Sequence, residues 1–245
     1  MAFSKSISLL GLPKPYISNQ HGALITLIFV NFIAVIHSSQ FHVMQIFALL
    51  FSLSAFHTTE IFLLPLHQKR QLKTAFLFYF CLSAIGSLFV FTNQSQLPVL
   101  LAGLLFLSTI FFIVKNNPQA KTTFHLVSFA LLIWISLFSL ITPSIKTILN
   151  LFIQLFIYFT FTVAFIHWRM GKISFEKLKI LAVIELGICF LLYSWKGIPA
   201  LIVILLSKNL IIYTTKGYWQ KAPLKIFGYE ETISLTLYII LMTFL

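Results

Sequence analysis

The chain has 245 residues, of which 59% are hydrophobic and 9% are charged, and its formal net charge is +12. A soluble domain carries roughly 25% charged residues, and a soluble fold of this size could not hide so much apolar surface. The composition therefore excludes an ordinary soluble domain and favours a membrane protein. The basic residues are spread over short stretches without forming one basic face, so they indicate membrane lipids as partners and no nucleic acid.

Apolar runs long enough to cross the hydrocarbon core, which takes about 20 residues of helix, recur along the chain. The first 21 residues contain no apolar region long enough for a cleavable signal, so we expect a cytoplasmic segment 1–21 and a single transmembrane domain 22–245. We predict an all-α polytopic bundle of about nine helices, with a tight helical hairpin turning at Trp195-Lys196-Gly197. The predicted helices are Gly22–Ser38, Val43–Leu66, Thr74–Phe91, Leu97–Val114, Phe124–Thr142, Thr147–Trp168, Ile180–Ser194, Gly197–Tyr213 and Ile226–Leu245.

The positions of Lys and Arg predict how the bundle is oriented. With the N-terminus inside, 14 of the 17 basic residues fall in inner segments and 2 fall in outer ones, while Lys208 lies within a helix. Cytoplasmic loops of membrane proteins are enriched in Lys and Arg. We therefore expect a cytoplasmic N-terminus and a C-terminus on the outer side.

Ionisable residues inside the predicted helices mark a candidate site. The five acidic residues are all glutamates, and four of them, like Lys208, fall in apolar segments. A charged group there is costly and usually faces a partner or a water-filled cavity. All of these charges fall in the inner half, which predicts a polar cavity open to the cytoplasm. Its expected lining residues are Gln20, His21, His57, Glu60, His167, Arg169, Glu185, Lys208 and Glu230.

A purely structural ion network is the alternative interpretation of the same charges. Glu60 could pair with Lys69 or Arg70, Lys208 could pair with Glu185, and Glu230 or Glu231 could extend to the membrane interface. No glycine-rich phosphate loop, metalloprotease motif or nucleophile elbow is present. The sequence therefore indicates no catalytic residue, metal site or cofactor.

Three stretches resemble the YwiC-like family of membrane proteins. They are Pro13–Ala23, which contains Gln20-His21-Gly22-Ala23, then Phe165–Lys172 and Lys225–Glu230. The resemblance implies a multi-pass protein of the bacterial cytoplasmic (inner) membrane and implies no catalytic residues. The predicted architecture is also similar to that of UbiA-type prenyltransferases, but those enzymes hold magnesium with aspartate-rich motifs, and this chain contains no aspartate.

The leading functional hypothesis is a site that binds or transfers an anionic amphipathic ligand, such as a lipid or isoprenoid phosphate. His21, Arg169 and Lys208 would hold the anionic head, while Glu60 and Glu230 would position a cation or take a proton. The alternatives are a small-solute transporter and a non-catalytic membrane assembly partner. The oligomeric state is left open.

Overall fold

The structure is a computed structural model that describes residues 21–37, 43–63, 72–115, 117, 121–140 and 143–244. These residues form ten α-helices and one 3-10 helix, and no strand occurs among them. The predicted all-α class is confirmed. The helices are α1 (His21–His37), α2 (Val43–Leu63), α4 (Lys73–Asn93), α5 (Leu97–Lys115), α6 (Lys121–Ser136), η2 (Leu137–Ser139), α7 (Ile145–Arg169), α8 (Phe175–Leu191), α9 (Ile198–Thr214), α10 (Lys216–Lys221) and α11 (Leu224–Phe244).

Two helices differ from the prediction. The described residues hold one more helix than predicted, because the connection after Thr214 contains the six-residue α10. α8 begins five residues earlier than expected, because the Ser174 hydroxyl accepts a hydrogen bond from the Lys177 amide at 3.3 Å and caps the helix there. This cap brings Glu176, Lys177 and Lys179 onto α8, so its first turns carry the charges.

The predicted hairpin joins α8 to α9 at Gly197. The backbone of Gly197 has φ +89°, in the left-handed region that glycine adopts without a steric penalty. A Cβ there would also lie 2.5 Å from the Gln154 side-chain oxygen on α7. The hairpin turn is therefore fixed by backbone conformation and by close packing against α7.

Three described helices are long and apolar enough to cross a membrane, judged by length and composition. They are α4 over Lys73–Thr92, α5 over Leu97–Lys115 and α7 over Ile145–Arg169. Shorter apolar helical stretches occur at Gln45–Thr59, Thr123–Ser139 and Ile198–Thr214. Membrane crossing by these three helices and by the other predicted segments remains a prediction.

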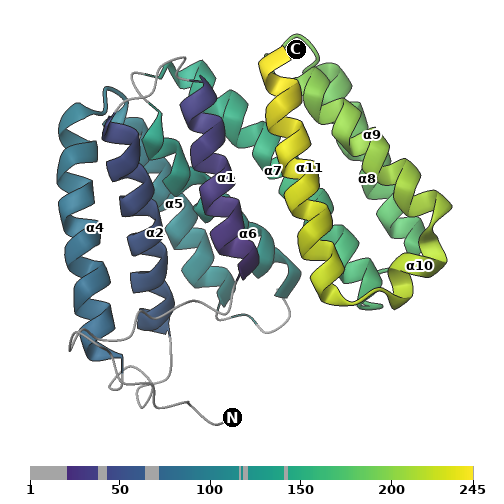
Figure 1. The fold of residues 1–245 in the computed structure, drawn as a ribbon, viewed down its shortest axis with the longest axis horizontal. Helices are drawn as coiled ribbons and strands as arrows, with labels where there is room; N and C mark the ends of the chain where they lie inside the picture. The colour runs from purple at the N-terminus through teal and green to yellow at the C-terminus, as the bar shows by residue number, and fades with distance from the viewer. Residues whose placement is uncertain are drawn as a thin grey trace.

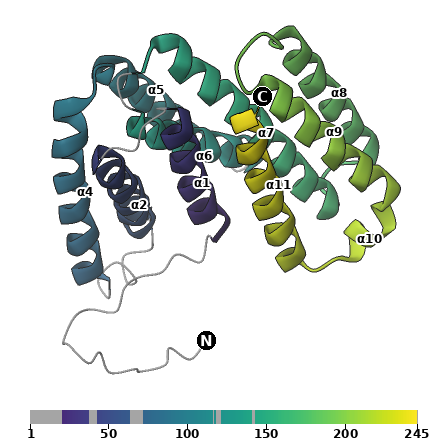
Figure 2. The same cartoon turned by 45° about the horizontal axis from the view of Figure 1, so that its top comes forward.

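The helices divide into two groups on either side of α7 (Figures 1 and 2). α1, α2, α4, α5 and α6 lie on one side, and α8 to α11 lie on the other, with α1 also contacting α11. In the apolar 18-residue stretch of α7, 72% of the residues are buried, against 17% in the corresponding stretch of α4 and 11% in that of α5. α7 is thus the central helix, and α4 and α5 are peripheral.

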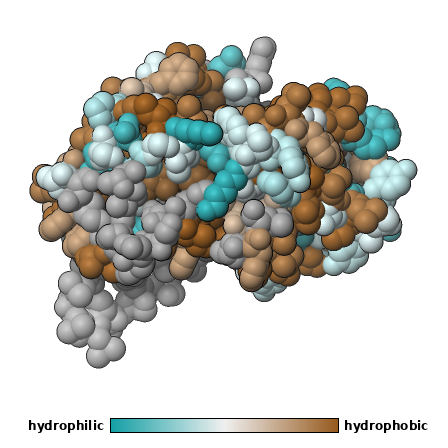
Figure 3. Space-filling model, turned by 90° about the horizontal axis from the view of Figure 1, so that it is seen from above, coloured by the Kyte–Doolittle hydropathy of each residue, from teal (hydrophilic) through white to brown (hydrophobic). Residues whose placement is uncertain are grey.

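Large apolar side chains are exposed on the outer helices. Examples are Leu88 on α4, Leu105 on α5, Val183 on α8 and Leu210 on α9. Seen from above, hydrophobic residues occupy much of the perimeter, whereas hydrophilic ones gather near the middle and at the right-hand edge (Figure 3). Soluble monomers rarely expose so much contiguous apolar surface, so this surface fits contact with lipid.

Candidate functional site

A stripe of polar side chains follows one face of the central helix α7. Asn150, Gln154, Tyr158 and Thr162 are spaced four residues apart, so they lie one above another on that face, and all four are buried. A buried polar group is costly unless it is hydrogen-bonded. The stripe therefore requires polar partners, and these come from α9, α11 and the α8–α9 turn.

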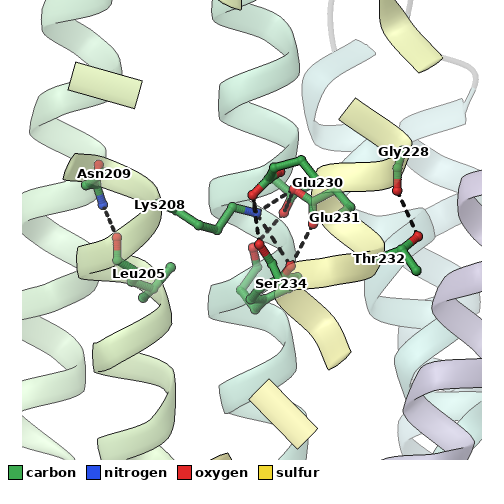
Figure 4. A network of polar contacts seen from close by, with 10 residues as sticks. Leu205, Lys208, Asn209, Gly228, Glu230, Glu231, Thr232 and Ser234 are labelled. Atoms are coloured by element: carbon green, nitrogen blue, oxygen red, sulfur yellow. Dashed lines mark hydrogen bonds and ion pairs between the residues drawn. The ribbon is translucent and has the colours of Figure 1, made fainter. Parts of the chain in front are cut away.

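One part of the stripe meets an ion pair between α9 and α11. Lys208 on α9 is 3% exposed, and its Nζ lies 2.5 Å from Glu231 Oε1 and 3.5 Å from Glu230 Oε1. Figure 4 shows the lysine reaching from α9 to the two glutamates on α11. A buried ammonium is tolerated when carboxylates pair with it closely, so these two glutamates allow Lys208 to be buried.

Glu231 also joins this ion pair to the polar stripe of α7. Its Oε2 accepts a hydrogen bond from the Tyr158 hydroxyl at 2.7 Å, and its Oε1 accepts one from Thr162 at 3.1 Å. Ser234 donates to Glu230 Oε1 at 2.7 Å, and Lys208 Nζ lies 4.8 Å from the centre of the Tyr158 ring. We call these residues the Lys208 cluster: Tyr158, Thr162, Lys208, Glu230, Glu231 and Ser234.

A third glutamate lies within electrostatic range of Lys208. Glu185 on α8 is 5% exposed, and neither of its carboxyl oxygens has a hydrogen-bond partner among the described residues. If Glu185, Glu230 and Glu231 were all ionised beside one ammonium, two negative charges would remain unbalanced. Burying unbalanced charge is very costly, so this part of the molecule attracts protons or other cations more strongly than anions.

A second polar contact joins the other part of the α7 stripe to the hairpin turn. Gln154 and Asn150 donate to the Lys196 carbonyl at 2.7 and 3.1 Å, and the Tyr238 hydroxyl on α11 donates to Gln154. These groups are neutral and bonded to one another. Their role is to hold α7, α11 and the turn before α9 together.

His57 lies away from the Lys208 cluster. Its Nδ1 is 2.8 Å from the Leu53 carbonyl oxygen, and its ring stacks on Tyr79 of α4 with 4.7 Å between centroids. α2 and α4 are on the opposite side of the molecule from α9 (Figure 1). The expected convergence of His57 with Lys208 and Glu230 in one cavity is therefore not observed, because α7 separates the two groups of helices.

His167 and Arg169 lie at the end of α7 and contact neighbouring segments. The His167 ring packs edge-on against His125 of α6, with 5.7 Å between centroids, and the Arg169 guanidinium donates to the Ala222 carbonyl. Gln20 is outside the described residues. For His21 and Glu60 the structure describes the helix and not the side chain.

No family model, curated protein or solved structure matches this chain significantly. The YwiC-like resemblance therefore remains a prediction made from the sequence. Two of its three stretches, Phe165–Lys172 and Lys225–Glu230, include the end of α7 and the start of α11, and Glu230 belongs to the Lys208 cluster.

The sequence predicted part of this cluster. Lys208 and Glu230 were expected to meet, and they do. Tyr158, Thr162, Glu231 and Ser234 were not among the expected site residues, although the four-residue spacing from Asn150 to Thr162 is a signal that could have found the α7 members. Glu230 and Glu231 are adjacent, and only the helix rotation decides which carboxylate lies closer to Lys208.

Proposed function

We propose that this chain is a multi-pass protein of the bacterial cytoplasmic membrane, with its N-terminus in the cytoplasm and the nine longer α-helices of its described residues embedded in lipid. Three observations support the proposal: three helices of spanning length and hydropathy, apolar side chains exposed on the outer helices, and the uneven distribution of Lys and Arg. In this arrangement α10 lies at the cytoplasmic surface.

Within this domain we propose that the Lys208 cluster takes up and releases a proton during transport of a small solute. The observation that carries the proposal is the excess of acid: Glu230 and Glu231 both pair with one buried ammonium, and a third buried carboxyl group, that of Glu185, lies within its electrostatic range. Carboxylates that face the interior of a membrane bundle are typical of proton relays in transporters. Because Lys208 occupies the space beside the carboxylates, a proton is the cation most easily added without displacing it.

Protonation would change a contact that holds two helices together. The ion pair between Lys208 and Glu231 joins α9 to α11. A neutral Glu231 attracts the ammonium less strongly, so Lys208 would shift towards Glu230, which already lies 3.5 Å away. A ligand or proton that favours one arrangement shifts the population towards it, and this is how proton binding would alter the packing of α9 against α11.

An anionic ligand fits the Lys208 cluster less well. Lys208 is paired with two glutamates, and Arg169 donates to the Ala222 carbonyl. An anionic head would have to displace both carboxylates from Lys208 and would leave them buried without their partner. The charge of the cluster therefore favours the transport hypothesis over the anionic-ligand hypothesis at this position.

Proton movement in vesicles tests this function. The purified protein is placed in liposomes that contain a pH-sensitive dye, and fractions of a bacterial small-molecule extract are added outside. We expect at least one fraction to move protons in the wild type and in Glu176→Gln, whose side chain is exposed, but not in Glu231→Gln. If every fraction gives the response of protein-free liposomes, the transport proposal is wrong.

A further inference from the structure

An apolar groove of about 410 Å³ lies between α8 and α9. Its walls come from these two helices and include Leu178, Ala182 and Val183 on α8, and Leu206 and Leu210 on α9. Val183, Leu206 and Leu210 are exposed, so the groove opens towards the surroundings of the bundle. Its volume is within the range of about 300–1,000 Å³ typical of small-molecule sites.

The groove has the length of one membrane leaflet. From Phe175 to Leu186, which both line it, α8 rises about 16 Å at 1.5 Å per residue. The hydrocarbon core of a bilayer is about 30 Å thick, so one leaflet takes up about half of it. An extended apolar chain from one leaflet would match the groove along its whole length.

Two lysines mark one end of the groove. Lys179 on α8 and Lys216 on α10 place their Nζ atoms 5.6 and 4.4 Å from the centre of the same ring, that of Phe175. The distribution of basic residues places this end at the cytoplasmic side. Lys179 also pairs with Glu176 at 2.7 Å, but the two side chains are 42% and 72% exposed, and exposed pairs are weak enough for another anion to compete.

We propose that this groove binds one acyl chain of an anionic phospholipid from the cytoplasmic leaflet, with the headgroup held by Lys179 and Lys216. The apolar walls account for the chain, and the two ammonium groups account for the charge of the head. The inference rests on the membrane placement proposed above and is independent of proton exchange at the Lys208 cluster. It also places an anionic amphipathic ligand, which the sequence led us to expect, on the lipid-facing side of α8 and α9.

Native mass spectrometry of the intact protein, released from mild detergent, tests the headgroup. Phosphatidylglycerol and phosphatidylethanolamine with identical acyl chains are titrated separately. We expect tighter binding of phosphatidylglycerol, and in the Lys179→Gln/Lys216→Gln variant a loss of that binding by at least about tenfold, with phosphatidylethanolamine unchanged. The control variant Lys146→Gln/Lys196→Gln, with the same change in charge at the opposite side, should bind like the wild type.

Filling the groove tests the acyl chain. Ala182→Phe should weaken the binding of both lipids, whereas Leu105→Phe on the distant α5 should not. If Ala182→Phe does not fold, Val183→Trp at the groove edge replaces it. Equal binding of the two lipids, or full phosphatidylglycerol binding in a folded groove-filled variant, would overturn the proposal. Failure of the membrane placement itself is recognised separately, because the protein would then fractionate without detergent.

Discussion

At the scale of single residues, Glu231 and Glu230 have different surroundings although they are neighbours in the chain. Glu231 contacts Lys208 at 2.5 Å and accepts hydrogen bonds from Tyr158 and Thr162, whereas Glu230 lies 3.5 Å from Lys208 and accepts from Ser234. Removing a partner from a buried charged network leaves groups without compensation. The two glutamates should therefore contribute unequally to stability.

Glu231→Ala should lower the free energy of unfolding by about 2 kcal/mol, the magnitude expected for hydrogen bonds to a charged group. Glu230→Ala should cost clearly less, because Lys208 keeps its shorter partner. Thermal unfolding of the two variants in the same detergent checks the order. An equal or larger loss for Glu230→Ala would mean that Glu231 is not the main partner of Lys208.

At the scale of helices, Gly197 is the position at which the α8–α9 hairpin depends most on one residue. Gly197→Ala would force an alanine to adopt φ +89° and bring its Cβ within 2.5 Å of Gln154 Oε1, and we expect a loss of at least about 1 kcal/mol. Gly187→Ala is the matched control, because a Cβ there meets nothing within 4 Å. In the middle of α8 it should stabilise by about 0.5–1 kcal/mol.

Thermal unfolding of the two glycine variants distinguishes these effects. Opposite changes in the unfolding temperature are expected. If Gly197→Ala were as stable as the wild type, the turn would not require a left-handed residue, and the packing of the turn against Gln154 would have to be looser than described.

The helices show how much of the fold could be predicted from the sequence. Runs of apolar residues predicted the positions of the long helices because each run is bounded by polar or helix-breaking residues. The short α10 and the early start of α8 were missed, because a six-residue helix leaves no periodic signal and the Ser174 cap lies in a stretch rich in charges. The approach of α9 to α11 depends on tertiary packing, which no local pattern encodes.

The same limit applies to the candidate site. Lys208, Glu185 and Glu230 were identified as candidate site residues because each is an ionisable residue inside an apolar run, where burial of charge is costly. The partition of the helices by α7 separates α2, which carries His57, from α9, which carries Lys208 (Figure 1). The position of a residue along its own helix does not predict this separation. The position of each residue along its helix was predictable, whereas the side of the bundle on which it lies was not.

At the scale of the whole molecule, the proposed topology fixes which connections face the cytoplasm. Lys196 in the α8–α9 turn is expected outside, and Lys216 on α10 is expected inside. Single cysteines at these positions, in a background in which Cys81 and Cys189 are replaced by alanine, can be labelled in intact cells with a membrane-impermeant thiol reagent. We expect labelling of Lys196→Cys and none of Lys216→Cys until the membrane is opened.

The opposite labelling pattern would contradict the cytoplasmic N-terminus. Labelling of both positions in intact cells would place α9 outside the membrane and would contradict the proposal that it spans. Both cysteine variants should unfold in detergent at the same temperature as the cysteine-free background, which serves as the control that they are folded.

The central claim is that the Lys208 cluster exchanges a proton, and infrared spectroscopy of its carboxyl groups tests this most directly. The purified protein in lipid is titrated across the physiological pH range, and the C=O band of protonated carboxylic acid is followed in the wild type, Glu231→Gln and Glu176→Gln. The account predicts a band that grows as the pH falls in the wild type and in Glu176→Gln, and that is changed or lost in Glu231→Gln. A band that does not change with pH, or that is identical in Glu231→Gln, would show that the cluster is a fixed ion network.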